Sequence, residues 1–121
     1  NAKKVSWIVC DILDFKPNRN YSIWHDRAAF HFLTEASQIM NYTEKVNRYV
    51  SEGLVIGTFS ENGPLKCSGL NITQYNFDKL KANFKENFNS TEGKEEVHST
   101  PFDTQQKFTF MCFKKKPNEL F

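Results

Sequence analysis

The sequence predicts an α/β fold, in which short buried strands alternate with amphipathic helices. Three observations indicate this class. The chain has 121 residues, which suffices for one domain or part of one. Short apolar runs, typical of buried strands, occur at residues 5–10, 21–24 and 54–59. Apolar residues at helical spacing separate the later runs, and the last segment of the chain alternates as a strand does.

The first half of the chain predicts two strands and one long helix. Residues 5–10 (VSWIVC) lie between lysines and acids and predict a buried strand, and residues 21–24 predict a second. Apolar residues at helical spacing over residues 28–33 then predict a turn or two of helix. A longer helix is expected to begin at Thr34 as its N-cap and to end at Gly53, because glycine commonly follows a helix C-terminus.

The second half predicts a central strand, a helix and a hairpin. Residues 54–59 (LVIGTF) are nearly all apolar, which predicts a strand covered by helices on both faces. A loop rich in Gly, Pro and Ser follows over residues 60–70, and Asn76 can cap a helix from Phe77 to about Phe88. The chain then ends in two strands, at residues 92–100 and 107–114, that we expect to form a hairpin.

Composition excludes several classes of function. The formal net charge is only +2 and no basic block is present, which argues against a nucleic-acid partner. No apolar run approaches the roughly 20 residues that span a bilayer, so no membrane segment is expected. The three cysteines are odd in number and widely spaced, which favours reduced thiols and a cytoplasmic protein. The alternative is a secreted binding domain, suggested by four Asn-x-Ser/Thr sequons at Asn20, Asn41, Asn71 and Asn89.

Polar residues follow the first predicted strand, where an open α/β sheet binds its ligands. Asp11 could accept a hydrogen bond from an exocyclic amine, while the backbone amide of Ile12 meets a ring nitrogen, as when a sheet edge binds adenine. The alternative is that Asp11 caps a turn or a helix, and the spacing alone favours this structural role.

A second polar cluster, His25-Asp26-Arg27, follows the second strand. His25 could act as a general base or bind substrate, and the alternative for Asp26 and Arg27 is a structural ion pair. Cys10 is the only further candidate ligand nearby, so we expect no metal site.

Two loops are also candidates for function. The loop after residues 54–59 contains Cys67 and Ser68, and loops of this length at the end of a strand are often functional. His98 precedes a Ser-Thr-Pro-Phe turn. The alternatives are that Cys67 packs in the interior and that His98 is a surface residue in an ordinary turn.

Taken in order, these segments resemble the C-terminal part of class I S-adenosylmethionine-dependent methyltransferases. More narrowly, the chain is similar to small bacterial enzymes of the methyltransferase-12 and tellurite/thiopurine-type groups. The resemblance covers nearly the whole chain and is most specific where WHDRAAFHFL, at residues 24–33, is paired with GPLKCSGL, at residues 63–70. WIVCDIL at residues 7–13 and HSTPF at residues 98–102 also contribute.

The resemblance implies a Rossmann-like sheet whose third to seventh strands correspond to the strands predicted here, with a final antiparallel hairpin. It implies S-adenosyl-L-methionine as cofactor and a small-molecule acceptor. Asp11 and Ile12 would contact the adenine, and His25 would lie near the methionine moiety and the transferable methyl as the candidate catalytic residue. The acceptor side would be formed by Asp26, Arg27, Phe30, His31, Phe59, Cys67, Ser68 and His98.

The chain also departs from this family, because the first strand with its acidic Gly-x-Gly loop and the acid of the second strand are missing. Two such β-α units occupy at least roughly 60 residues. We therefore expect residues 1–121 to be a partial methyltransferase domain that is inactive alone. The two missing strands would lie between the strands at residues 5–10 and 21–24. Their absence would expose sheet edges, so the alternative is a non-catalytic fragment that forms a strand-exchanged homodimer.

Overall fold

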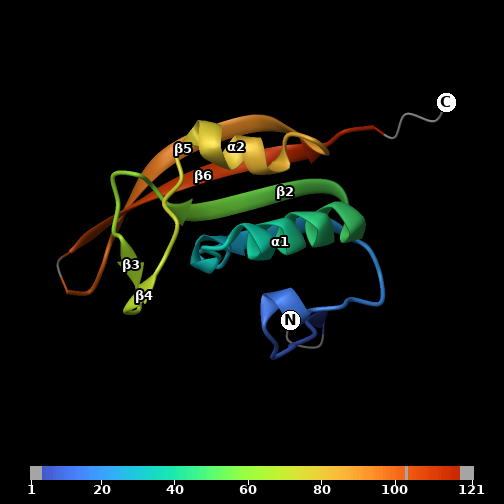
Figure 1. Cartoon of the computed structure of the whole chain (residues 1–121), viewed down its shortest axis with the longest axis horizontal. Coiled ribbons are helices and arrows are strands. Elements are labelled where there is room, and N and C mark those ends of the chain that lie inside the picture. Colours follow the sequence, from blue (N-terminus) through green and yellow to red (C-terminus); the bar gives the residue numbers. More distant parts are fainter. Residues whose placement is uncertain (1–3, 103, 118–121) are drawn as a thin grey trace.

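The computed structural model describes residues 4–102 and 104–117 and shows a four-stranded sheet with two helices packed on one face (Figure 1). The elements of this layer pair are β1 (Tyr21–Arg27), α1 (Ala36–Tyr49), β2 (Val50–Phe59), α2 (Phe77–Phe84), β5 (Phe88–Ser99) and β6 (Gln105–Lys115). A small separate hairpin, β3 (Lys66–Cys67) with β4 (Leu70–Asn71), projects from the loop after β2.

The strand order is β1-β2-β6-β5. β1 pairs with β2 in parallel, as two strands joined by a helix must, whereas β6 pairs antiparallel with both β2 and β5. The predicted α/β class and the predicted terminal hairpin are therefore confirmed. The hairpin places its second strand, β6, next to β2 and its first strand, β5, at the outer edge.

Helix α1 begins one residue later than the sequence predicts and ends at Tyr49, before the predicted end at Gly53. Glu35 is its N-cap in a capping box with Gln38, whose side-chain oxygen accepts from the backbone N–H of Glu35 at 3.2 Å. The helix ends at Tyr49, and Gly53 lies within β2, so the prediction that Gly53 ends the helix is wrong. Close packing between strands explains a glycine at this position of β2, because a Cβ at Gly53 would lie 3.1 Å from Cδ1 of Ile23 on the neighbouring strand.

Helix α2 begins as predicted. The side chain of its N-cap, Asn76, accepts from the backbone N–H of Lys79 at 2.8 Å. The helix ends at Phe84, because Phe88 already belongs to β5, where its side chain is buried in the core.

The predicted strand at residues 5–10 is wrong. These residues form no strand and pair with none in the part of the chain that the structure describes, and Trp7, Ile8 and Val9 are 84%, 62% and 102% exposed. A strand needs a neighbour, and the described sheet ends at β1. The chain instead packs a 3-10 turn (Ile12–Asp14) against α1, where Lys45 Nζ donates to the carbonyls of Ile12 at 3.0 Å and Leu13 at 2.8 Å.

The core lies between the helices and one face of the sheet. Its buried side chains come from α1, α2, β2, β6 and the segments beside them: Phe30, Leu33, Tyr42, Val46, Val50, Leu54, Ile56, Tyr75, Leu80, Phe84, Phe88, Met111 and Phe113. Among the described residues no helix covers the opposite face, so the prediction of helices on both faces of β2 is wrong. On that open face Ile23 is 55% exposed and Val55 is half-buried.

Candidate functional site

The candidate site lies at the edge of the sheet where β1 and β2 end. Because β6 runs antiparallel to β2, its first residues meet the end of β2, and Phe59 lies opposite Phe108. The same register places Phe108 opposite Glu96, so the last part of β5 reaches this edge as well. Most of the residues singled out from the sequence therefore come from strand ends that share one edge, as the strand order requires.

Asp26 organises the turn that leaves β1. Its two carboxylate oxygens accept from the backbone N–H groups of Ala29 at 2.9 Å and Phe30 at 3.0 Å, and it also accepts from the hydroxyl of Tyr42. The turn contains Ala28 in the left-handed region, with φ of 63°, and the Ala28 N–H donates to the Gly57 carbonyl at 2.8 Å. These bonds hold the end of β1 in one conformation.

The side chain of Asp26 points to the α1 side of the sheet and is 6% exposed. Burial raises the pKa of its carboxyl, and the bonds from Tyr42, Ala29 and Phe30 oppose that rise. The Tyr42 hydroxyl accepts in turn from Nε1 of Trp24 at 2.8 Å. All three hydrogen bonds described for the Asp26 carboxylate are to the protein itself, and its expected role facing the acceptor stays a prediction.

His31 and Phe30 are also internal. Nδ1 of His31 accepts from the backbone N–H of Phe59 at 3.0 Å, so the proton of the neutral ring lies on Nε2. Burial lowers the pKa of His31 to about 4. Phe30 is fully buried and stacks on Tyr75 at 5.2 Å between ring centroids. His31 thus joins the turn after β1 to the end of β2, whereas Phe30 packs in the core; the expected acceptor-side role of both residues stays a prediction.

Three buried polar atoms near this edge have no hydrogen-bond partner among the described residues: Nε2 of His31, Oγ1 of Thr58 and the hydroxyl of Tyr75. Burial raises the pKa of Tyr75 to about 12, so its hydroxyl keeps its proton. Thr58 and Tyr75 were not predicted as site residues. No sequence pattern marks these two residues, because each is buried only when the loop before α2 packs onto the end of β2.

On the opposite face of β1, Arg27 lies over an aromatic surface. Its Cζ is 5.3 Å from the ring centroid of Phe108 and 5.8 Å from that of Phe110. The ring centroid of Phe108 also lies 6.4 Å from that of His98 and 5.1 Å from that of Phe59. The structure therefore brings three predicted site residues, Arg27, Phe59 and His98, together around a phenylalanine that sequence reasoning missed.

His25 lies two residues before Arg27 and is exposed on the same face of β1, because side chains alternate along a strand. Asp11 lies elsewhere, in the turn against α1. Its side chain accepts from the backbone N–H of Leu13 at 2.9 Å, which is the structural role that the spacing favoured. The structure thus places Asp11 and Ile12 in a capped turn and not at a strand end.

Cys67 and Ser68 lie in the small β3–β4 hairpin. Its two-residue turn is Ser68-Gly69, with φ of 51° and 78°, the left-handed pair that a tight hairpin of this type requires. The side-chain nitrogen of Gln74 braces the preceding loop by donating to the carbonyls of Gly63 at 2.9 Å and Pro64 at 3.1 Å. Cys10, Cys67 and Cys112 are all free thiols in the described structure.

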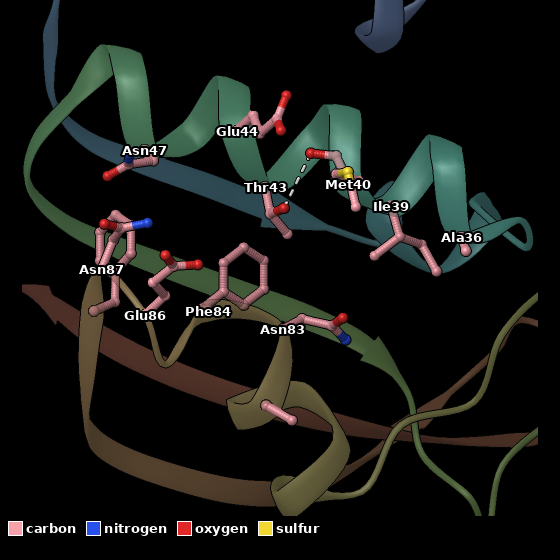
Figure 2. Close-up of a pocket in the computed structure, with 12 residues that line it drawn as sticks. Ala36, Ile39, Met40, Thr43, Glu44, Asn47, Asn83, Phe84, Glu86 and Asn87 are labelled. Atoms are coloured by element: carbon pink, nitrogen blue, oxygen red, sulfur yellow. Dashed lines mark hydrogen bonds between the residues drawn. The ribbon is translucent and has the colours of Figure 1, made fainter.

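An open groove of about 590 Å³ lies between α1 and α2, away from this edge (Figure 2). Its lining combines apolar and amide side chains: Ala36, Ile39, Met40, Thr43, Glu44, Asn47, Ala82, Asn83, Phe84, Glu86, Asn87 and Phe88. None of the predicted site residues lines it. Over residues 4–102 and 104–117 there is also no group of three or more side chains suited to hold a metal ion, and no helix is long and apolar enough to cross a membrane.

No family model and no curated protein matches the sequence. Solved structures do match. The N-methyltransferase NodS from Bradyrhizobium japonicum WM9 superposes with a TM-score of 0.70 at 13% identity, covering 95% of this chain and 64% of that chain. NodS in complex with S-adenosyl-L-homocysteine gives a TM-score of 0.68 at 12% identity, over 93% of this chain and 55% of that chain.

A third match is the 1,6-didemethyltoxoflavin-N1-methyltransferase of Burkholderia thailandensis, whose structure holds 1,6-didemethyltoxoflavin and S-adenosylhomocysteine. Its TM-score is 0.69 at 11% identity, over 91% of this chain and 50% of that chain. The chain has a Rossmann-like methyltransferase fold. It spans about half the length of the methyltransferases that it matches. The edge that holds the candidate site is formed by the last residues of β1, β2 and β5 and the first residues of β6.

Proposed function

We propose that this chain forms the acceptor side of an S-adenosylmethionine-dependent methyltransferase that modifies a small molecule. The observation that carries the proposal is the strand order β1-β2-β6-β5 with its antiparallel β6, which superposes over more than nine-tenths of the chain on methyltransferases holding S-adenosylhomocysteine. The modest net charge of +2 supports a small acceptor over a nucleic acid. The free thiols support a cytoplasmic protein, and the sequence pattern supports the small bacterial methyltransferase-12 and tellurite/thiopurine-type groups.

The proposed roles follow the faces of β1. His25 and Arg27 point to the open face at the carboxyl end of the strand, so His25 is proposed to lie near the transferable methyl and Arg27 near the acceptor. Phe59 and His98 border the same cluster through Phe108, and Cys67 and Ser68, on the loop after β2, are proposed to line the acceptor side as well. Asp26, Phe30 and His31 are positioning residues. Asp11 and Ile12 are proposed to meet the adenine.

Methyl transfer from a sulfonium needs alignment of acceptor, methyl and leaving sulfur more than it needs covalent help, so a rigid strand end is well suited to it. His25 contributes as a base only where the acceptor must lose a proton. Because the chain spans about half of the matched methyltransferases, we propose that it works with the remaining part of the fold and is inactive alone.

Calorimetric titration of S-adenosylmethionine into the complete gene product that contains these residues tests the proposal. Binding is expected, with a loss of affinity in His25→Ala and none in the matched surface variant His98→Ala, which lies on the acceptor side. A folded gene product that releases no heat with the cofactor contradicts the proposal. The isolated chain serves as the comparison and is expected not to bind.

A strand-exchanged homodimer is the second candidate, and it rests on a contrast between the two sheet edges. The β5 edge carries Glu92, Lys94, Glu95 and Glu96, charges of the kind that protect a free edge. The β1 edge (YSIWHDR) has no lysine or proline, and the apolar side chains of Val5, Trp7, Ile8 and Val9 are exposed. Light scattering is expected to show a dimer that Trp7→Lys disrupts and Leu65→Lys, a control at another exposed apolar residue (72% against 84% for Trp7), does not. A wild-type monomer would exclude this candidate.

A further inference from the structure

Arg27 is held over the sheet by an aromatic shelf, formed by Phe108 and Phe110. The two rings stack on each other, 5.7 Å apart and 23° from parallel, and the guanidinium of Arg27 lies above both. Phe108 is itself buried, with its ring edge-on to Phe59. The surface beneath the guanidinium is therefore held in place by the packing of Phe108 against Phe59 on the open face of the sheet.

Gly57 makes this arrangement possible. In the strand register it lies directly between Arg27 on β1 and Phe110 on β6. A Cβ at position 57 would lie only 2.3 Å from Cε1 of Phe110. The missing side chain lets the Phe110 ring lie across β2 toward Arg27, so three neighbouring strands cooperate to place one guanidinium.

The charges around Arg27 leave its donors available. No hydrogen bond or ion pair joins the Arg27 side chain to any residue in the described part of the chain. Asp26, its neighbour, points to the other face. Glu96, which lies opposite Phe108, pairs instead with Lys94 at 3.6 Å. His25 and His98 are the remaining ionisable groups of the cluster, and neither is an acid.

We propose that Arg27 and its aromatic shelf form a binding site for an oxyanion, a carboxylate or phosphate, carried by the methyl acceptor. A guanidinium that is stacked on rings through its face keeps its N–H groups free along its edge, and that edge matches the two oxygens of such a group. The two rings also restrict where the guanidinium lies, so less side-chain entropy is lost when the anion arrives than for an arginine without such a surface. The site stands at the carboxyl end of β1, beside the position proposed for the methyl.

Identifying the anion with the acceptor rests on the proposed function, but anion binding itself does not. The chain offers an internal comparison, since it has three arginines: Arg19 lies over Tyr21 and Arg48 over Tyr49, each on a single ring. Their side-chain Nε–H signals can be followed together by NMR in the intact chain. Arg27→Lys assigns the Arg27 signal.

Titration with benzoate and with inorganic phosphate, at constant ionic strength, is the test, and neutral benzamide is the isosteric control. The Arg27 signal is expected to move along a saturating curve, with a dissociation constant on the order of millimolar for one partly exposed contact, while Arg19 and Arg48 move little. The tighter of the two anions identifies the acceptor's charged group as carboxylate or phosphate. Benzamide is expected to leave the Arg27 signal in place.

Phe110→Leu is expected to weaken anion binding at least threefold, by removing part of the shelf. Phe102→Leu is its matched control on the same hairpin, because Phe102 is 87% exposed and stands apart from Arg27. Equal shifts of all three arginines, or a Phe110→Leu variant that binds as wild type does, would overturn the proposal. The comparison among the three arginines does not depend on any variant of the shelf. It also does not depend on cofactor binding, so a failure of the proposed methyltransferase function would not change its result.

Discussion

The hydroxyl of Tyr42 donates to the carboxylate of Asp26 and so ties helix α1 to the turn that ends β1. The same hydroxyl accepts from Trp24, which stands two residues before Asp26 on the same face of the strand. Tyr42 is fully buried and Asp26 nearly so. A buried acid is thus supplied with three donors, two of which belong to the turn whose left-handed Ala28 it stabilises.

Replacing Tyr42 by phenylalanine is expected to lower the free energy of unfolding by about 1.5–3 kcal/mol, because a buried charged acceptor and the Trp24 N–H each lose a partner. Urea denaturation measures the change. Tyr49→Phe on the same helix is the control and should change stability by less than about 0.5 kcal/mol, since its hydroxyl makes no hydrogen bond in the described structure. Equal effects of the two variants would contradict the role given to Tyr42.

His31 predicts a dependence of stability on pH. Its folded pKa of about 4 lies below the ordinary 6.5, so between these values the unfolded chain binds a proton that the folded chain does not. The contribution of neutral, buried His31 to the free energy of unfolding is therefore fully present above about pH 6.5. It is lost as the pH falls toward 4, and the total loss is at most about 3 kcal/mol. Asp26 has a raised pKa and acts in the opposite direction, so the comparison must isolate the histidine.

His31→Gln makes that comparison, because it removes the titrating ring and keeps an acceptor for the Phe59 N–H. Denaturation midpoints at several pH values should fall less steeply on acidification in this variant than in the wild type. Exposed His98→Gln should retain the wild-type slope. If His31→Gln and the wild type lose stability in parallel, the buried neutral histidine is not responsible.

The N-cap of α2 gives a local prediction. Asn76→Ala removes the acceptor for the Lys79 N–H and is expected to cost about 1 kcal/mol. Asn76→Asp keeps that acceptor and adds a negative charge at the helix N-terminus, so it should retain most of the stability. Thermal melts followed by circular dichroism would show this order, and an alanine variant as stable as the aspartate variant would refute it.

The sequence predicted best what depends on local pattern. The apolar runs ending at Phe59 and alternating around Phe110 both became strands, and Asn76 became the cap that its residue type suggests. The prediction of a strand at residues 5–10 was wrong because an apolar run indicates a strand but does not show whether a neighbouring strand is there to pair with it. The same limit applies to the site: the chemistry of Asp26 and His31 was noticed, but the side-chain partner of Asp26 and the backbone donor to His31 lie 16 and 28 residues away, on other elements.

Strand alternation could have corrected part of the site prediction. Asp26 shares a face of β1 with Trp24, an aromatic residue suited to the helix side, whereas Arg27 shares the other face with His25. The residues that hold Arg27 were beyond reach, since Phe108 and Phe110 meet it only through the register of two strand pairs.

The pair Gly57 and Phe110 gives the sharpest test of that register. Gly57→Ala gains about 0.4–1 kcal/mol by restricting the unfolded chain, but its methyl group would overlap the Phe110 ring and cost about 1–3 kcal/mol, so net destabilisation is expected. Because the obstacle is a side chain and not backbone, Phe110→Leu should relieve it, and the double variant should be more stable than the sum of the single changes by at least about 0.5 kcal/mol. Gly57→Ala combined with Phe102→Leu, a distant change at the hairpin tip, should be additive. Urea denaturation of the single and double variants tests this coupling. Additive effects of Gly57→Ala and Phe110→Leu would mean that the Phe110 ring does not lie across Gly57 and so does not form the aromatic shelf under Arg27 in this way.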